Sequence, residues 1–278
     1  MKFRNIFGVG LLFGFYAIQG ILPSPALAHF VWIETPATIA PGEKSEARLY
    51  FGESHEFLRE EAGGRLDNRE NMKVWAVDSK GERQSVSFKR QVNFYSAKVL
   101  VEKPGRYNLI AMDLESEVVD GTKFVTVGIF FKPMFYARAG FLAFEPGRVS
   151  EREAEITEMM DLDIVPVTSH LNPLKGTITP KVGEEIVLQV FYKGEPVAKA
   201  KPLALSPIGW VKELRTNSMG MTRFTPLWPG TYVIDYVHMD KTPGEYEGKS
   251  YEGVRHRATL TIQVENPHHG KKKRKKKK

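Results

Sequence analysis

Short runs of apolar, β-branched and aromatic residues alternate with Pro-Gly and other Gly turns along most of the chain. Runs of this length are typical of β-strands, and Gly and Pro mark the turns between them. In the first half, the pattern predicts strands at residues 30–34, 45–51, 73–77, 85–88, 97–101, 106–112 and 124–131. In the second half, it predicts strands at residues 162–167, 185–191, 202–205, 221–225, 231–237 and 257–264. The sequence therefore predicts an all-β protein.

A charged segment separates the two series of predicted strands. Residues 147–160 lack strand character, and we interpret them as a linker that can hold a short helix. The motif Pro-Gly-x-Tyr occurs once in each series, at Pro104 and at Pro229, and opens an apolar strand both times. This short repeat predicts two tandem immunoglobulin-like β-sandwich domains, at residues 29–146 and 161–266.

The first 28 residues have the pattern of a secretory signal peptide. Lys2 and Arg4 precede an apolar run at residues 6–21, and a small-residue cleavage site ends at Ala28. Cleavage after Ala28 makes His29 the first residue of the mature chain. The alternative is an uncleaved membrane anchor, because the apolar run is slightly shorter than the ~20 residues that span a bilayer. We expect export to the periplasm.

The formal net charge of +7 is concentrated at the two ends of the chain. All eight residues from Lys271 to Lys278 are basic, and Lys2 and Arg4 add two more. The rest of the chain holds 30 basic and 33 acidic residues, which argues against a nucleic-acid-binding domain. Residues 267–278 form a His- and Lys-rich tail that we predict to be disordered, and its charge suits an anionic membrane surface.

Composition and motifs exclude several classes of chemistry. The chain has no Cys, which excludes disulfides, thiol nucleophiles and thiolate metal sites. Any metal must therefore be held by nitrogen, oxygen or Met sulfur. The chain also lacks the nucleophile elbow, the phosphate-binding loop, the dinucleotide fingerprint and the zinc-protease helix motif. We therefore expect a protein that is not an enzyme.

The predicted mature N-terminus is a strong candidate for metal binding. A free α-amine has a pKa near ~7.7 to 8.0, so it gives up its proton to a metal near neutral pH. Together with its own imidazole, the amine of His29 forms a chelate that suits nickel, cobalt, copper or zinc.

Three further histidines are candidate ligands. His55 lies in a loop between Glu53 and Glu56, and either carboxylate can orient its ring. His238 follows the strand that begins after the second Pro-Gly turn, and His256 precedes the last predicted strand. Each of the three also has an ordinary interpretation, as a solvated or hydrogen-bonded histidine.

Four segments of the chain together resemble the DUF4198 family. They are HFVWIE at residues 29–34, MDLDIVP at residues 160–166, YKGEPVAKA at residues 192–200 and WPGTY at residues 228–232. Members of that family are exported bacterial proteins associated with nickel and cobalt uptake, including the NikK-like accessory component of energy-coupling-factor metal transporters. The resemblance implies a periplasmic tandem β-sandwich that binds a divalent transition metal and works beside a membrane component of a metal transporter.

The resemblance also implies the ligand residues. His29 corresponds to the family's mature N-terminal histidine, and His55 lies where the family often has a Gly-His turn. We expect a nickel or cobalt ion at His29, with His55, His238 or His256 completing the site, and with copper or zinc as alternatives. Two other functions stay open. One is a histidine-brace copper protein, either a carrier or similar to a polysaccharide monooxygenase, and the other is a non-catalytic envelope or adhesion module.

Overall fold

The computed structural model describes residues 29–123, 127–146, 159–167 and 178–266. The regular structure of these residues consists of twenty-one β-strands and two short 3-10 helices. This confirms the all-β prediction. No helix within the described residues is long and apolar enough to cross a membrane. The predicted signal peptide at residues 1–28 and the basic tail at residues 267–278 lie outside the described residues.

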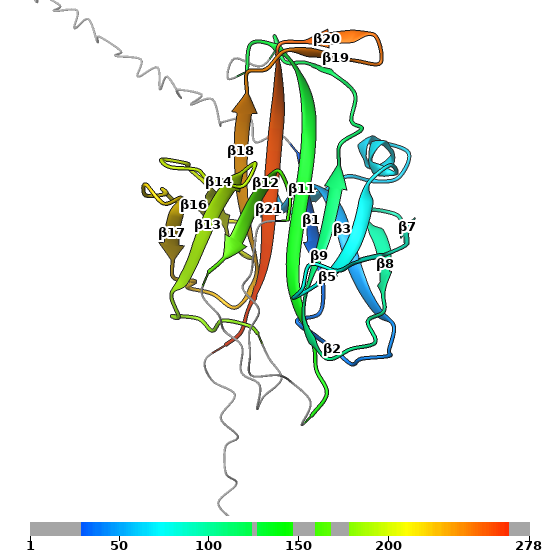
Figure 1. Cartoon of the computed structure of the whole chain (residues 1–278), viewed down its shortest axis with the longest axis vertical. Coiled ribbons are helices and arrows are strands. Elements are labelled where there is room, and N and C mark those ends of the chain that lie inside the picture. The colour runs from blue at the N-terminus through cyan, green and yellow to red at the C-terminus, as the bar shows by residue number, and fades with distance from the viewer. Residues whose placement is uncertain (1–28, 124–126, 147–158, 168–177, 267–278) are drawn as a thin grey trace, which may run out of the picture.

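A ten-stranded sheet forms the centre of the molecule (Figure 1). Its main path consists of β16 (Val211–Glu213), β15 (Leu203–Leu205), β18 (Gly230–Asp240), β21 (Gly253–Val264), β11 (Phe130–Ala143), β9 (Gly105–Asp113), β5 (Lys73–Asp78) and β6 (Arg83–Ser85). Two short strands, β10 (Val119–Asp120) and β2 (Thr38–Ile39), each pair with β11. The long strands β11 and β21 run parallel to each other, from Phe131 opposite Gly253 to Ala139 opposite Thr261.

Two smaller sheets cover the central sheet. The first contains β1 (Phe30–Glu34), β3 (Ser45–Glu53), β4 (Leu58–Arg59), β7 (Phe88–Arg90) and β8 (Tyr95–Val99). The second contains β12 (Leu162–Pro166), β13 (Ile186–Tyr192), β14 (Glu195–Pro196) and β17 (Met221–Phe224). A hairpin of β19 (Gly244–Tyr246) and β20 (Lys249–Tyr251) extends beyond the central strands at the top of Figure 1. The two 3-10 helices are η1 (Ser54–Glu56) and η2 (Arg65–Arg69).

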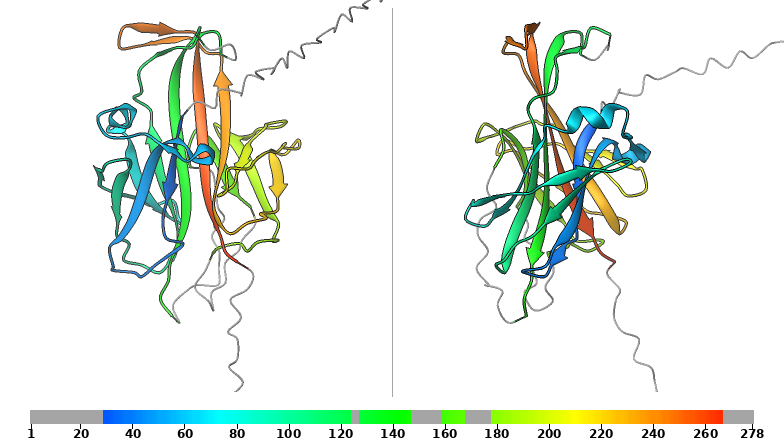
Figure 2. Two further views of the ribbon diagram at one scale, coloured as in Figure 1. Left: turned by 180° about the vertical axis from the view of Figure 1, so that it is seen from behind. Right: turned by 90° about the vertical axis from the view of Figure 1, so that its right-hand side faces the viewer.

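Alternation of side chains along the central strands produces two buried cores on opposite faces of the ten-stranded sheet (Figure 2). On β11, Ala137 packs into the core under the first small sheet, whereas its neighbour Tyr136 packs into the core under the second. On β18, Val233 belongs to a smaller cluster with Phe30 and Trp32 of β1, whereas Ile234 packs into the core under the second small sheet. The described residues thus form three β layers.

The two halves of the chain share the central sheet. The ladder between β11, from predicted domain 29–146, and β21, from predicted domain 161–266, extends over nine residue pairs. The finer expectation of two separate immunoglobulin-like sandwiches in tandem is not confirmed, because four strands of the second predicted domain and four of the first lie side by side along the main path of one continuous sheet. Most of the predicted linker, residues 147–158, lies outside the described residues, and so does any helix there.

Most predicted strands recur with shifts of a few residues at their ends, and β1 has the predicted bounds. The clearest difference concerns the strand predicted at residues 124–131. Of this range, residues 124–126 lie outside the described residues, and the observed strand β11 is Phe130–Ala143. The sequence pattern therefore predicted only the first two residues of β11, which is the longest strand of the described structure.

Candidate metal centre

Histidine and carboxylate side chains meet where β1 begins and β3 ends. Phe30 pairs with Gly52, so the antiparallel ladder places His29 directly across from Glu53. The Nδ1 atom of His29 lies 3.4 Å from Oε1 of Glu53. After β4, which pairs with the other edge of β3, the Glu60 carboxylate lies 2.6 Å from His29 Nε2. The two groups are close enough for an ion pair, but the imidazole ring is not oriented for a hydrogen bond to this carboxylate. His29 Nε2 therefore has no hydrogen-bond partner among the described residues.

The 3-10 helix η1 follows β3 directly and adds two further donors. One ligand atom each from Glu53, His55 and Glu56 lies within 4.8 Å of the other two. Glu53 and His55 are each only 9% exposed. The Nδ1 atom of His55 is buried and has no hydrogen-bond partner among the described residues. Because a buried imidazole nitrogen normally has a hydrogen-bond partner, this unpaired nitrogen is a candidate metal ligand. We call His29, Glu53, His55, Glu56 and Glu60 the His29 cluster.

A tight local backbone holds the His29 cluster together. Gly52 has a φ of +148°, and a Cβ at this position would lie 2.3 Å from the backbone oxygen of Leu58. Only glycine therefore lets β4 close against β3 at this point. Phe57 ends η1 in the left-handed conformation, with a φ of 59°, and its N–H donates to the Ser54 carbonyl. This turn lets η1, which carries His55 and Glu56, and the segment after β4, which carries Glu60, both lie close to the end of β3.

The carboxylates of the His29 cluster repel one another. Burial raises the pKa of Glu53 above its ordinary value, and the nearby negative charge of Glu56 raises it further. The positive charges of His29, His55 and Arg257 act in the opposite direction. Arg257 is already engaged, since its guanidinium donates to both carboxylate oxygens of Asp235 at 2.7 Å. A bound divalent cation would relieve the repulsion that remains.

His238 and His256 form a second group in another part of the fold. They are directly opposite each other in the ladder between β18 and β21, and their ring centroids are 6.5 Å apart. Nδ1 of His256 lies 2.9 Å from the hydroxyl of Tyr136, and its Nε2 lies 3.3 Å from the hydroxyl of Tyr192. The ring of His238 packs on that of Tyr192 at 4.1 Å. The Tyr192 hydroxyl also donates to Asp240 at 2.6 Å.

The pKa values of both histidines in this second group are lowered. Burial of its ring, together with the neighbouring His238, lowers the pKa of His256 to about 4. Burial also lowers the pKa of His238, against the opposing effect of Asp240. Both rings are therefore neutral at pH 7. Since phenol hydroxyls lie at both nitrogens of His256, this arrangement is typical of a hydrogen-bonded core histidine.

The two groups of histidines lie on opposite faces of the central sheet. His256 shares a face with Ala258 and Leu260, which pack under the second small sheet. The next residue, Arg257, faces the other side, where its guanidinium carbon lies 4.6 Å from the centre of the Phe30 ring. The structure thus places both His29 and His55 beside Glu53, and it places His238 and His256 on the opposite face of the central sheet.

The sequence offered different signals for the members of the His29 cluster. His29 and His55 are predicted ligands, and Glu53 and Glu56 are predicted to orient His55. Glu60 is absent from that prediction. Its approach to His29 depends on the pairing of β4 with β3, and no local motif marks that pairing.

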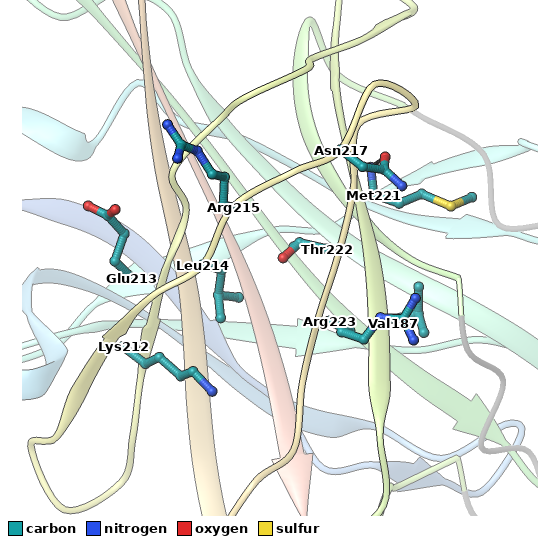
Figure 3. A pocket seen from close by; sticks show the side chains of 9 residues that line it. All are labelled: Val187, Lys212, Glu213, Leu214, Arg215, Asn217, Met221, Thr222 and Arg223. Atoms are coloured by element: carbon teal, nitrogen blue, oxygen red, sulfur yellow. Dashed lines mark hydrogen bonds between the residues drawn. The ribbon is translucent and has the colours of Figure 1, made fainter.

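A separate hollow lies between the free edges of β16 and β17 (Figure 3). It has a volume of about 400 Å³. Its lining consists of Val187, Lys212, Glu213, Leu214, Arg215, Asn217, Met221, Thr222 and Arg223. The lining includes no histidine and no member of the His29 cluster. We therefore treat the hollow as distinct from the candidate metal centre.

Comparisons with known proteins add one family match. A family model described as "Domain of unknown function (DUF4198)" matches residues 26–240. No curated protein matches the chain. A solved structure titled "Biofilm associated protein - BSP domain" aligns at 11% identity with a TM-score of 0.20, over 84% of this chain and 30% of its own. This chain spans less than a third of that structure, and a similarity of this size carries no argument about function.

Proposed function

The chain belongs to the DUF4198 family, and we propose that it is an exported accessory protein that binds a divalent nickel or cobalt ion for a metal-uptake system. One observation carries the proposal. The carboxylate of Glu53 lies close to two imidazoles, with Oε1 at 3.4 Å from Nδ1 of His29 and a carboxylate oxygen within 4.8 Å of a ring nitrogen of His55. These three groups offer two nitrogen ligands and one oxygen ligand, and none of them is a thiolate.

The donor set fits the proposed cargo. Imidazole and carboxylate groups bind divalent first-row transition metals, and a free α-amine at His29 adds one more nitrogen. Intrinsic affinity for such a site rises from cobalt through nickel to copper. The choice of nickel or cobalt therefore rests on the family resemblance, and supply in the cell decides which metal is loaded.

Partial exposure of the cluster supports a carrier over a permanent structural site. The side chain of Glu56 is 60% exposed, whereas that of His55 is 7% exposed. The side chain of His29 is 17% exposed. Structural metal sites are enclosed by their ligands, whereas a site with an open side lets an ion enter and leave. The proposed partner is the membrane component of a metal transporter, which would accept the ion from this open side.

A titration with paired variants tests the proposal. Protein purified after export is titrated calorimetrically with Ni²⁺ and Co²⁺, together with the variants His29→Ala and His238→Ala. Loss of the imidazole at His29 is expected to weaken binding by about tenfold or more, as is usual when a metal site loses a supporting group. The control His238→Ala removes a partly buried histidine on the opposite face and is expected to bind like the parent. Equal dissociation constants for the parent and His29→Ala would refute the site.

A further inference from the structure

Exposed apolar side chains gather beside the His29 cluster. Eleven large apolar side chains are exposed among the described residues, and six of them belong to three short segments. The six are Phe57, Leu58, Ile208, Trp210, Val211 and Leu227. Single exposed apolar residues are normal, but a contiguous group usually marks a surface that binds something.

Close backbone contacts make this group continuous. Gly209 has a φ of +84°, and a Cβ there would lie 2.9 Å from the His55 carbonyl oxygen and 3.6 Å from the Phe57 ring. The turn between Ser206 and Trp210 therefore rests on η1. The Trp210 ring meets the ring of Trp228 edge-on, with centroids 5.9 Å apart. We call Phe57, Ile208, Trp210, Leu227 and Trp228 the aromatic face.

Local hydrogen bonds fix the turn that carries Ile208 and Trp210. The backbone N–H of Trp210 donates to Ser206 Oγ at 2.8 Å, and that of Ser206 donates to the Trp210 carbonyl at 2.8 Å. Phe57 is 69% exposed although it adopts the left-handed conformation, which is unfavourable for a bulky side chain. Backbone strain combined with an outward-facing ring favours a binding role over a packing role.

The described part of the chain ends close to the same face. Val264, two residues before the last described residue, pairs with Gly230. A Cβ on Gly230 would lie 2.8 Å from the Pro207 ring, so the end of β21 lies close to the turn that carries Ile208 and Trp210. The next twelve residues, 267–278, contain eight Lys or Arg residues and can extend at most about 40 Å.

We propose that the aromatic face binds an anionic phospholipid membrane, and that the basic residues 271–278 add electrostatic attraction to the anionic headgroups. Trp and Phe side chains favour the interface between headgroups and acyl chains, and Lys and Arg are attracted to anionic headgroups. Either contribution alone gives weak binding, and the two together give a stable attachment. His55 is two residues from Phe57, so this attachment brings the His29 cluster close to the bilayer surface. Membrane binding itself does not depend on a bound metal.

Vesicle flotation tests the proposal with the exported protein. Vesicles of phosphatidylcholine mixed with phosphatidylglycerol are compared with vesicles of phosphatidylcholine alone. The triple variant Phe57→Asn/Ile208→Ser/Leu227→Ser removes three apolar side chains, and Asn tolerates the left-handed backbone at position 57. We expect its partition onto the anionic vesicles to fall by about tenfold or more, because each replaced side chain loses its favourable transfer from water.

Two controls separate the contributions. The double variant Val92→Ser/Met219→Ser removes side chains that are 72% and 58% exposed outside the aromatic face, and we expect it to bind like the parent. Deletion of residues 271–278 should weaken binding to anionic vesicles and remove most of its salt dependence. Matching thermal transitions of all variants show that each is folded.

Three results would overturn the proposal. The first is a parent protein that does not float with anionic vesicles, and the second is a triple variant that floats as well as the parent. The third is self-association of the parent in sedimentation velocity that the triple variant abolishes while vesicle binding is unchanged. That result would assign the aromatic face to a contact between two copies of the chain. Because no metal is added, failure of these tests leaves the calorimetric test of the metal site unaffected.

Discussion

Glu53 is the residue at which stability of the fold and the proposed metal binding oppose each other. Its carboxylate is 9% exposed and lies beside Glu56, and burial together with this neighbour raises its pKa. A group that disfavours the metal-free fold at pH 7 and contacts two candidate ligands is typical of a functional site. Its negative charge is unfavourable in the metal-free fold, and the proposed cation would offset it.

The substitution Glu53→Gln separates the two effects, because Gln keeps the shape and removes the charge. We expect the melting temperature of the metal-free protein to rise by a few degrees, since relief of about 1 kcal/mol raises Tm by about 2–4 °C in a chain of this size. We also expect weaker Ni²⁺ binding. Differential scanning calorimetry with and without Ni²⁺ measures both. The exposed Glu43→Gln serves as the control, and a lower Tm for metal-free Glu53→Gln would contradict the account.

Sequence reasoning reached individual members of the His29 cluster but could not assemble them. His29 and His55 have local signals, namely the predicted cleavage site and the flanking carboxylates. Their proximity depends on the register of β1 against β3, which places His29 across from Glu53. A shift of one residue would turn the side chains of the strand to its other face. Glu60 has no local signal, because it reaches His29 only through the pairing of β4.

At the scale of elements, β11 shows why local propensity failed. The strand contains Lys132, Pro133 and Gly140, three residue types that strands disfavour. Tertiary contacts compensate for this. The buried ammonium of Lys132 donates to the backbone carbonyls of Leu114 and Ser116, and β9 and β21 cover the two edges of the strand. Neither compensation is visible in the local sequence.

The paired strands β18 and β21 carry a pH-sensitive pair of histidines. The pKa of His256 is about 4 in the folded protein, against an ordinary value of 6.5. The unfolded chain therefore takes up this proton at a higher pH than the folded protein does. The stabilisation of the folded protein by the neutral, buried His256 is therefore complete above pH 6.5. It is lost as the pH falls from about 6.5 to about 4. The lowered pKa of His238 acts in the same direction.

We expect acidification across this range to reduce the free energy of unfolding by about 3 kcal/mol through His256 alone. Asp161 and Asp240 near the ring oppose this loss, whereas Lys193 adds to it. Urea denaturation at a series of pH values measures the effect. The variant His256→Gln keeps hydrogen-bonding groups near Tyr136 and does not titrate, so its stability should depend less on pH. Identical pH profiles of the variant and the parent would contradict the assignment.

At the scale of the whole molecule, the two halves are joined by a buried ion pair as well as by the ladder between β11 and β21. Arg138 on β11 donates to Asp163 on β12 at 2.6 Å, and both side chains are 0% exposed. Asp163 also accepts a hydrogen bond from the backbone N–H of Met159 at 2.8 Å. The pair connects a strand of the first half to a strand of the second. The pattern of strands and turns predicted the sheets but gave no sign that they merge.

Removal of one partner of this pair should destabilise the whole chain. Arg138→Met leaves Asp163 buried without its cation, which is expected to cost about 3–5 kcal/mol. The double variant Arg138→Met/Asp163→Leu removes both charges and should recover much of this loss. Urea denaturation of the two variants and the parent gives the comparison. A double variant that is less stable than Arg138→Met would show that the charges do not act as a pair.

The most direct test of the central claim concerns the N-terminus of the mature chain. The intact mass of protein exported by its own signal is measured first, and we predict a chain that begins at His29. That material and a version with one extra residue before His29 are then titrated with Ni²⁺, Co²⁺ and Cu²⁺. We predict tight one-to-one binding that the extra residue abolishes, because it removes the free amine from the imidazole of His29. Weak and equal binding by both versions would contradict the metal-binding account.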